Sequence, residues 1–543
     1  MNKFISIIAF AALTWSCGNR NSGVSDAPSA AIDSQSFIQH VKKLSSDEFL
    51  GRKPFTRGDT LTVSYIAEAF QKIGLAPGSG DSYFQEVPMV EITSTPTAPL
   101  TFSRSGSQFH LDHLDDFVIG SRRLDERISV SESEVVFAGF GIVAPEYQWD
   151  DYAGLDAKGK TVIVLVNDPG FYDKSLFKGD TMTYYGRWTY KFEEAARQGA
   201  TGVLIIHDTD AASYGWDVVR SGWSGPQLNL ETQENGASRA AIEGWLTAEA
   251  AGRLFELAGG AGDLIASAKK TGFKPVDLGV SVSVGLENNF RKSSSNNVLA
   301  KIPGNKYPDE YLIYTAHWDH LGIGEPVDGD SIYNGAIDNA SGIAALFELA
   351  KAFKSAETPP DRSILFLAVT AEEQGLLGSA YYANNPVYPL NKTVANINID
   401  ALSPIGRTND ISVIGLGHSE MDDYLIRAAD RQGRRVVPGG TPSAGSFFRS
   451  DHFNFAKVGV PALYTGSGRD VIGKDSSTVA ELRDAFTKRY HQVTDEYDET
   501  WDVSGMMADI NLIFDVGYTL SRERTFPRWK AGSEFKKIGE QRL

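Results

Sequence analysis

The sequence predicts an α/β fold in which a mainly parallel mixed sheet is flanked by helices and carries a second, β-rich unit as an insertion. After Asn296, short apolar segments alternate with segments of helical periodicity, which is typical of a parallel sheet covered on both faces. Three of the apolar segments end in ionisable residues, in YLIYTAH, SILFLAVTAEE and TVANINID. Sites in open α/β sheets form beyond the carboxyl ends of the strands, so we expect a functional site there.

Length and charge limit the possible classes of protein. The chain has 543 residues, long enough for two or three domains. Hydrophobic residues make up 42% and charged residues 22% of it, as in ordinary globular proteins. The formal net charge is −17, which makes nucleic acid and anionic membrane surfaces poor partners. We therefore expect no nucleic-acid partner.

The first residues indicate export. Lys3 precedes an apolar run that is too short to span a bilayer but suits a signal peptide. The segment LTWSCG around Cys17, the only cysteine, resembles a bacterial lipoprotein processing site. This resemblance implies a signal peptide at 1–16, lipidation of Cys17 and a flexible tether at 17–35. We expect a lipoprotein facing the periplasm or cell exterior, attached to the membrane only through its lipid. The alternative is a plain secretory signal and a soluble secreted or periplasmic protein.

Further segments follow along the chain. Residues 36–130 begin with two segments of helical periodicity and continue as short strands and turns. Residues 131–284 read as strands, a helix and glycine turns. Residues 285–525 hold the alternating strands and helices, and the basic tail at 526–543 is expected on the surface.

Histidines and carboxylates near the strand ends suggest a metal site. Two adjacent divalent metals need a bridging carboxylate, and each needs further histidine or carboxylate ligands. The chain offers His317, Asp338, Glu373, Asp400 and a late histidine. A single aspartate of this kind is usually a cap or turn residue. Four such residues beside small residues at successive sheet ends favour a metal centre.

Four motifs carry a resemblance to a known family. HWDHLGIG, NGAIDNASG, AEEQGLLGS and NINIDAL resemble successive signatures of the M28 family of zinc metallopeptidases, and SSDEFLGRKP resembles the N-terminal segment of that family. The stretch from VVFAGFGIVAP to GVLIIHD resembles the protease-associated (PA) domain that many members carry. The resemblance implies the zinc-dependent exopeptidase fold, with a PA domain inserted at 131–284 and the catalytic domain at 285–525.

The resemblance also implies a role for each ligand candidate. Asp338 would bridge two Zn²⁺ ions, with cobalt or manganese as possible replacements. His317 and Asp400 would complete the first metal site, and Glu373 and His491 the second. Glu372 would act as the general base, and Asp319 would orient His317.

Several histidines compete for the last ligand position. His491 lies in YHQVTDEYDE, which is similar to the family's Tyr-His segment followed by acidic residues, with Asp495 as a possible partner. His452 lies in SDHFNF, which is similar to the family's cleft wall. We therefore prefer His491. His320 and His418 match no family role and are interpreted as structural or exposed.

The SDHFNF segment itself is interpreted as part of the substrate cleft. Ser450, Asp451 and Phe453 are expected to shape contacts with a peptide substrate. The PA-like unit is expected to restrict access to the cleft or to contact other proteins, and we prefer a lid that admits only short, unfolded peptides.

The expected function is a metal-dependent aminopeptidase that acts on peptides. A carboxypeptidase on the same fold would need basic residues such as Arg449 or Arg469 to hold the terminal carboxylate. A glutaminyl cyclotransferase would use one zinc, and a receptor-like binding protein would lose ligands or the base. The presence of Glu372 and all five ligand candidates ranks the receptor-like alternative low.

Overall fold

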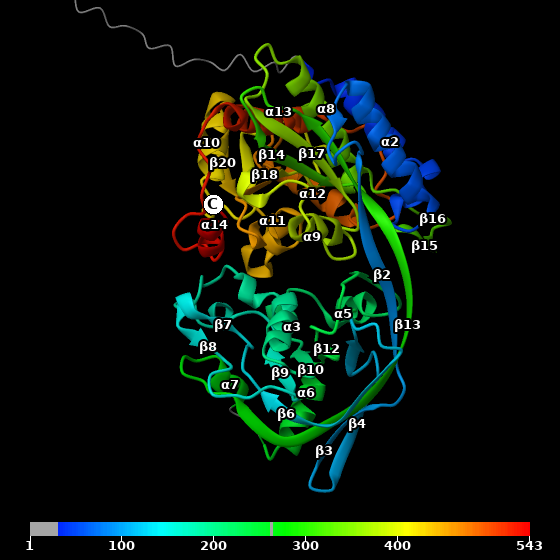
Figure 1. Cartoon of the computed structure of the whole chain (residues 1–543), viewed down its shortest axis with the longest axis vertical. Coiled ribbons are helices and arrows are strands. Elements are labelled where there is room, and N and C mark those ends of the chain that lie inside the picture. Colours follow the sequence, from blue (N-terminus) through cyan, green and yellow to red (C-terminus); the bar gives the residue numbers. More distant parts are fainter. Residues whose placement is uncertain (1–30, 261–263) are drawn as a thin grey trace, which may run out of the picture.

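The computed structural model describes residues 31–260 and 264–543. The predicted signal peptide, Cys17 and most of the predicted tether lie outside these residues. The described chain forms two lobes joined by two long strands, β2 (Phe84–Pro96) and β13 (Val276–Ile302), as Figure 1 shows. We call residues 31–77 and 307–543 the large lobe and residues 100–268 the small lobe. No described helix is long and apolar enough to span a membrane.

The sheet of the large lobe confirms the predicted α/β fold. Its four central strands run parallel to one another, while β19 is antiparallel to β21. The strands β14, β17 and β18 are largely or wholly buried, as expected for a sheet covered on both faces. Across the sheet the order is β20 (Arg435–Pro438), β19 (Asp410–Val413), β21 (Ala462–Ser467), β18 (Thr393–Asn398), β14 (Tyr307–His317) and β17 (Arg362–Val369), followed by the end of β13.

Alternate side chains of these strands enter two different cores. Tyr314 and Phe366 pack in one core, whereas Ile313 and Leu365 pack in the other, because successive strand residues face opposite sides. One face is covered by α1 (Ser34–Leu44), α2 (Arg57–Ile73), α8 (Ser341–Ser355), α10 (Met421–Arg431) and α13 (Ser504–Arg522). The other face is covered by α9 (Leu377–Asn384) and α11 (His452–Lys457).

The remaining elements of the large lobe lie around this framework. They are β1 (Ala76–Pro77), the hairpin β15 (Gly322–Val327) and β16 (Asp330–Tyr333), α12 (Ser476–Arg489) and α14 (Lys536–Arg542). The prediction that the tail at 526–543 lies on the surface is wrong in one respect. Trp529 and Phe535 are buried against Phe447 and Phe453. Large apolar side chains are usually buried even where the surrounding segment is basic in composition.

The small lobe has its own parallel strands and two apolar cores. The strands β6, β9, β10 and β12 pair in parallel, and β5 adds an antiparallel strand. The strands are β3 (Leu100–Arg104), β4 (Ser107–Leu111), β5 (Phe117–Gly120), β6 (Arg127–Phe137), β7 (Val143–Ala144), β8 (Trp149–Asp150), β9 (Thr161–Leu165), β10 (Gly202–Ile206), β11 (Gln227–Leu230) and β12 (Ile242–Leu246). The helices are α3 (Trp188–Arg197), α4 (Thr209–Ala212), α5 (Trp216–Gly222), α6 (Ala248–Leu257) and α7 (Leu264–Ala268).

The two lobes share backbone pairing. From Leu286 to Val298, β13 pairs with β2 antiparallel, and its last residues then pair with β17. Residue 284, where the inserted unit was expected to end, lies inside this continuous strand. The two-stranded connection therefore fixes the small lobe beside the large one (Figure 1).

Candidate metal centre

Three parallel strands bring the predicted ligands to one edge of the sheet. His317 is the last residue of β14, and the pair Glu372–Glu373 follows the end of β17 after a short turn. Asp400 follows the end of β18. Because β14 lies between β17 and β18 and runs parallel to both, their carboxyl ends converge. Asp338 reaches the same place from the segment that leads into α8.

Two groups of potential metal ligands meet at Asp338. In the first, His317 Nε2 lies 3.1 Å from Asp338 Oδ1 and 3.4 Å from Asp400 Oδ1. In the second, His491 Nε2 lies 3.4 Å from Asp338 Oδ2 and 2.9 Å from Glu373 Oε2. The two carboxylate oxygens of Asp338 thus face different histidines, which is the arrangement that a bridging carboxylate requires.

His320, for which the sequence suggested no role, also belongs to this cluster. It is fully buried, and its Nδ1 lies 2.7 Å from Glu373 Oε1. His320 joins the second of these two groups, because His320, Asp338 and Glu373 also have ligand atoms close enough to hold one ion. The signal for His320 was its place in HWDH, one position after Asp319, but spacing alone does not tell a ligand from a core histidine.

The unsatisfied atoms of this cluster fit a bound cation. Asp338 Oδ1, His320 Nε2 and His491 Nε2 are buried without a hydrogen-bond partner. Such groups are costly to bury unless something compensates them. Although burial lowers it, the pKa of His317 is raised well above its usual range by Glu372, Asp338 and Asp400, which reflects the excess of negative charge. Mixed histidine and carboxylate donors suit Zn²⁺ and related ions.

Asp319 supports the centre differently from the prediction. Its carboxylate Oδ1 is 3.8 Å from His317 Nδ1, whereas its own backbone carbonyl lies at 3.2 Å from the same nitrogen. The carboxylate instead accepts the backbone N–H groups of Glu372, at 3.0 Å, and Glu373, at 3.3 Å. Burial raises the pKa of Asp319 to about 7. Asp319 therefore holds the Glu-Glu turn, because the N–H groups of that turn are closer to its carboxylate than the imidazole is.

Glu372 lies beside the ligands and has a perturbed proton affinity. Burial raises the pKa of Glu372 well above its usual range, and the charges of Asp400 and Glu373 add to this effect while His317 opposes it. Perturbed carboxyl groups of this kind cluster at functional sites. A carboxylate with raised proton affinity beside a metal centre is able to accept a proton from water.

Three residues at the same place have a strained backbone. Ala371, Ala401 and His491 have φ values of 52°, 60° and 57°. This left-handed conformation is unfavourable for residues with a side chain and costs about 1–3 kcal/mol at each position. Two of the three residues are direct chain neighbours of Glu372 and Asp400, and the third is itself a ligand candidate. The surrounding fold therefore imposes these conformations on the site.

Two further residues brace the loops that carry ligands. The Asp495 carboxylate accepts the N–H groups of Ile337 and Asp338, each at 3.0 Å, so it holds the Asp338 loop. The guanidinium of Arg52 is buried and donates to the carbonyl oxygens of Trp318 at 2.8 Å and Gly335 at 2.8 Å. Sequence reasoning missed Arg52, because three of its four partners are backbone atoms more than 260 positions away.

The predicted substrate-contact residues lie behind the ligands. Ser450 Oγ donates to Asp400 Oδ2 at 2.6 Å, and Asp451 accepts a hydrogen bond from Ser379 Oγ at 2.5 Å. Phe453 packs in an aromatic cluster with Tyr184 and Phe448. All three predicted residues are at most 5% exposed. Ser450 thus positions a ligand, while burial leaves Asp451 and Phe453 little surface for a substrate.

The histidines that were set aside have other surroundings. Both ring nitrogens of His452 are buried without hydrogen bonds, among Phe447 and Tyr464, and burial lowers its pKa to about 3. His418 stacks on Phe447 at a ring distance of 4.8 Å. Neither forms part of the two ligand groups.

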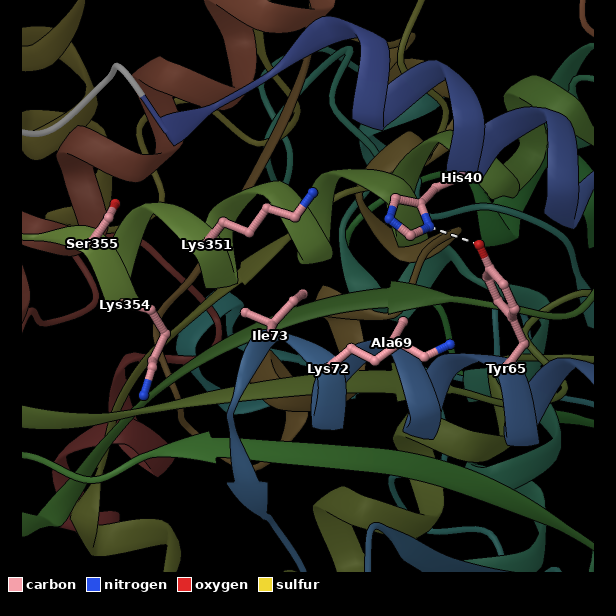
Figure 2. A pocket seen from close by; sticks show the side chains of 8 residues that line it. All are labelled: His40, Tyr65, Ala69, Lys72, Ile73, Lys351, Lys354 and Ser355. Carbon is pink, nitrogen blue, oxygen red and sulfur yellow. Dashed lines mark hydrogen bonds between the residues drawn. The ribbon is translucent and has the colours of Figure 1, made fainter.

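A cavity of about 540 Å³ lies elsewhere, between α1, α2 and α8. Figure 2 shows its lining residues, His40, Tyr65, Ala69, Lys72, Ile73, Lys351, Lys354 and Ser355. Two of its lysines have acidic neighbours on their own helices, since Lys72 faces Glu68 and Lys351 contacts Glu348. No predicted ligand lines this cavity, which is therefore separate from the metal centre.

The fold and the ligand cluster define an α/β protein with a histidine and carboxylate metal centre at the strand ends. Residues 297–514 match the sequence profile of Peptidase family M28. This part of the chain, which carries all five predicted ligands, is thus similar to that family.

Curated relatives and one solved structure are similar to parts of the chain. Aminopeptidase YwaD of Bacillus subtilis is 36% identical over 185 residues, 32% of this chain and 35% of that protein. Aminopeptidase NAALADL1 of Rattus norvegicus is 31% identical over 207 residues, 33% of this chain and 26% of that protein. Carboxypeptidase Q of Xenopus laevis is 28% identical over 252 residues, 46% of this chain and 43% of that protein. The chain therefore matches less than half the length of each relative. The structure of an aminopeptidase from Aneurinibacillus sp. strain AM-1 covers 92% of this chain and 96% of its own, at 18% identity and a TM-score of 0.47.

Proposed function

We propose that the protein is a metal-dependent aminopeptidase that removes N-terminal residues from short peptides and uses two Zn²⁺ ions. The observation that carries this proposal is the position of Asp338, whose two oxygens face His317 and His491 separately. Asp400 lies beside His317, and Glu373 lies beside His491. The similarity to two aminopeptidases supports the choice of reaction.

Three residues have separate roles in the proposed peptide hydrolysis. Bound divalent cations would supply Lewis acidity and a water of lowered pKa. Glu372 takes the proton of the attacking water and returns it to the amine that leaves. Asp319 keeps Glu372 in place through the backbone N–H that its carboxylate accepts. Ser450 holds Asp400 through a hydrogen bond of 2.6 Å.

Peptides with free and with acetylated N-termini test this proposal. Metal-replete protein is expected to shorten a free peptide stepwise from its N-terminus and to leave the acetylated form intact, because acetylation removes the α-amino group that an aminopeptidase must recognise. Activity is expected to vanish with a chelator and to return with Zn²⁺. Products are identified by mass spectrometry. Release of C-terminal residues from both forms would instead establish a carboxypeptidase.

We also infer that the small lobe is a PA-type insertion that limits access to the metal centre. Its support is contact between the lobes near the cleft-wall segment, where Met182 N–H donates to the Pro442 carbonyl at 3.1 Å. The same peptide assay tests the inference when free peptides of increasing length are compared. Turnover that falls steeply with length supports a restrictive lobe, and equal turnover of long and short peptides contradicts it.

We propose, finally, that the protein is an exported lipoprotein attached to the membrane through Cys17. The support is the lipoprotein-like segment around the only cysteine of the chain. Replacing Cys17 with serine is expected to move the protein from the membrane fraction to the soluble fraction of expressing bacteria, since no acyl chain would remain. An unchanged membrane fraction in an immunoblot would contradict lipidation at this residue.

A further inference from the structure

The small lobe meets the large lobe beside the metal centre. Lys457 of α11 contacts Glu193 of α3 at 2.9 Å, and Lys178 contacts Glu534 at 2.5 Å. In Figure 1, α3 and α5 of the small lobe lie opposite α9 and α11 of the large lobe. Helix α9 begins a few residues after Glu373, and α11 begins directly after the segment of Ser450. We call the contact region between the lobes, marked by the pairs Lys457–Glu193 and Lys178–Glu534, the seam. It borders the elements that carry the metal centre.

Two arginines from different lobes lie at this seam. Arg187 directly precedes α3, and Arg449 directly precedes Ser450. A β-carbon placed on Gly445 would lie 3.6 Å from Arg187 Cδ, so Arg187 lies against the loop that leads to Arg449. The Arg449 guanidinium donates to the Ala444 carbonyl in its own loop at 2.8 Å and to Ser213 Oγ of the small lobe at 3.2 Å. The two arginines thus lie near each other, and Arg449 is the chain neighbour of Ser450, which donates to Asp400.

Arg187 is half-buried and lacks the charged partner that two more deeply buried arginines have. Its Nε is buried without a hydrogen bond, and among the described residues its guanidinium makes no hydrogen bond or ion pair. Arg362, by contrast, pairs with Glu310 at 2.7 Å, and Arg434 pairs with Asp509 at 2.7 Å. The Arg187 guanidinium lies 5.9 Å from the centre of the Trp188 ring.

An unpaired cation beside a second cation is electrostatically unfavourable. Burial and the charge of Arg449 lower the pKa of Arg187 to about 10, so Arg187 stays charged at neutral pH. An uncompensated charge that is partly removed from water destabilises the folded state. An anion that binds at the seam would remove this penalty, and a carboxylate matches the planar fork of a guanidinium.

We propose that Arg187 and Arg449 bind a carboxylate of the substrate, in its simplest form the C-terminal carboxylate of a short peptide whose N-terminus lies at the metal centre. This inference rests on the proposed aminopeptidase function and adds to it a substrate class, peptides of a few residues with a free C-terminus. An acidic side chain of the peptide offers the same chemistry and is the second possible source of the carboxylate.

Binding to an inactive protein tests the proposal without turnover. Metal-loaded Glu372→Gln protein is titrated by calorimetry with trialanine, with trialanine amide, and with an amide whose middle residue is glutamate. Adding Arg187→Gln or Arg449→Gln is expected to weaken binding of trialanine about 10- to 100-fold, the range for a lost charge-assisted hydrogen bond. Binding of trialanine amide is expected to change less than about threefold, because it presents no carboxylate to the arginines.

Arg127→Gln is the matched control. This residue lies in the same lobe, its side chain is 86% exposed, and it only approaches Glu287 at 3.8 Å. Arg127→Gln removes the same charge as the two test substitutions and is expected to leave the dissociation constant of every peptide unchanged. Thermal unfolding of each variant establishes that it is folded; if Arg187→Gln does not fold, the comparison uses Arg449→Gln, whose side chain is exposed.

The outcomes separate this inference from the proposed function. Loss of affinity for trialanine alone supports recognition of the C-terminus, and loss for the glutamate-containing amide alone supports recognition of an acidic side chain. Equal affinity for all three peptides, equal losses for all three, or no binding of any of them overturns the proposal. Turnover of both peptides by wild-type protein, with equal kcat/KM, would keep the aminopeptidase and reject the arginine site. Arginine-dependent binding without any turnover would keep the site and reject the aminopeptidase.

Discussion

Replacing Glu372 with glutamine is expected to lower kcat by about 10²- to 10⁴-fold, the usual contribution of a general base. Glutamine has nearly the same size but cannot accept the proton of the attacking water. The ligands around Asp338 remain in place, so the metal content of the variant is expected to equal that of the wild type. The measurement is steady-state hydrolysis of a free peptide by metal-replete protein, with metal content determined by elemental analysis.

Glu325→Gln is the control for this experiment. Glu325 lies in the exposed hairpin strand β15, so the same chemical change there is expected to leave kcat unaltered. A near-normal kcat for Glu372→Gln with full metal content would show that another group serves as the base. A loss of metal together with a loss of activity would show that Glu372 is itself a ligand.

Replacing Asp338 with asparagine is expected to remove most of the bound metal and nearly all activity. Asp338 is 5% exposed and approaches His317 and His491 through different oxygens. The substitution removes the negative charge that two neighbouring cations share, and it replaces one ligand oxygen by a nitrogen with two protons. Metal content is therefore expected to fall from about two ions per chain to one or fewer.

His320→Gln is compared with Asp338→Asn, because it is expected to cause a smaller loss of bound metal. His320 contacts Glu373 on one side of the cluster only, so its loss is expected to weaken metal affinity about 10- to 100-fold, as for residues that support a ligand. Competition with a chromogenic chelator measures both variants. Full metal content in Asp338→Asn would contradict a bridging role, and a larger loss in His320→Gln than in Asp338→Asn would make His320 the more important ligand.

The predicted class of fold and the main ligand set depend on local signals. Apolar runs such as SILFLAV predict buried strands because a strand covered on both faces cannot carry polar side chains. Parallel strands converge at their carboxyl ends, so His317, Glu373 and Asp400 were expected together before any contact was known. In the structure these three side chains do lie around Asp338.

Roles that depend on distant partners were beyond the sequence. Asp319 was expected to orient His317 because it follows two positions later, yet its carboxylate accepts the backbone of Glu372 and Glu373. The direction of a side chain after a strand end is decided by the turn that packs against it. His320 was set aside for the same reason, since only the folded chain brings it to Glu373.

The sequence by itself determined where apolar strands end in histidines and carboxylates, because strand periodicity and motif spacing are properties of neighbouring residues. Tertiary structure decided which polar atoms are left without partners. Arg52 is satisfied by carbonyl oxygens of remote loops, whereas Arg187 has no such partner at the seam between the lobes. Whether a buried charge is compensated depends on every segment packed around it, and those segments come together only in the folded chain.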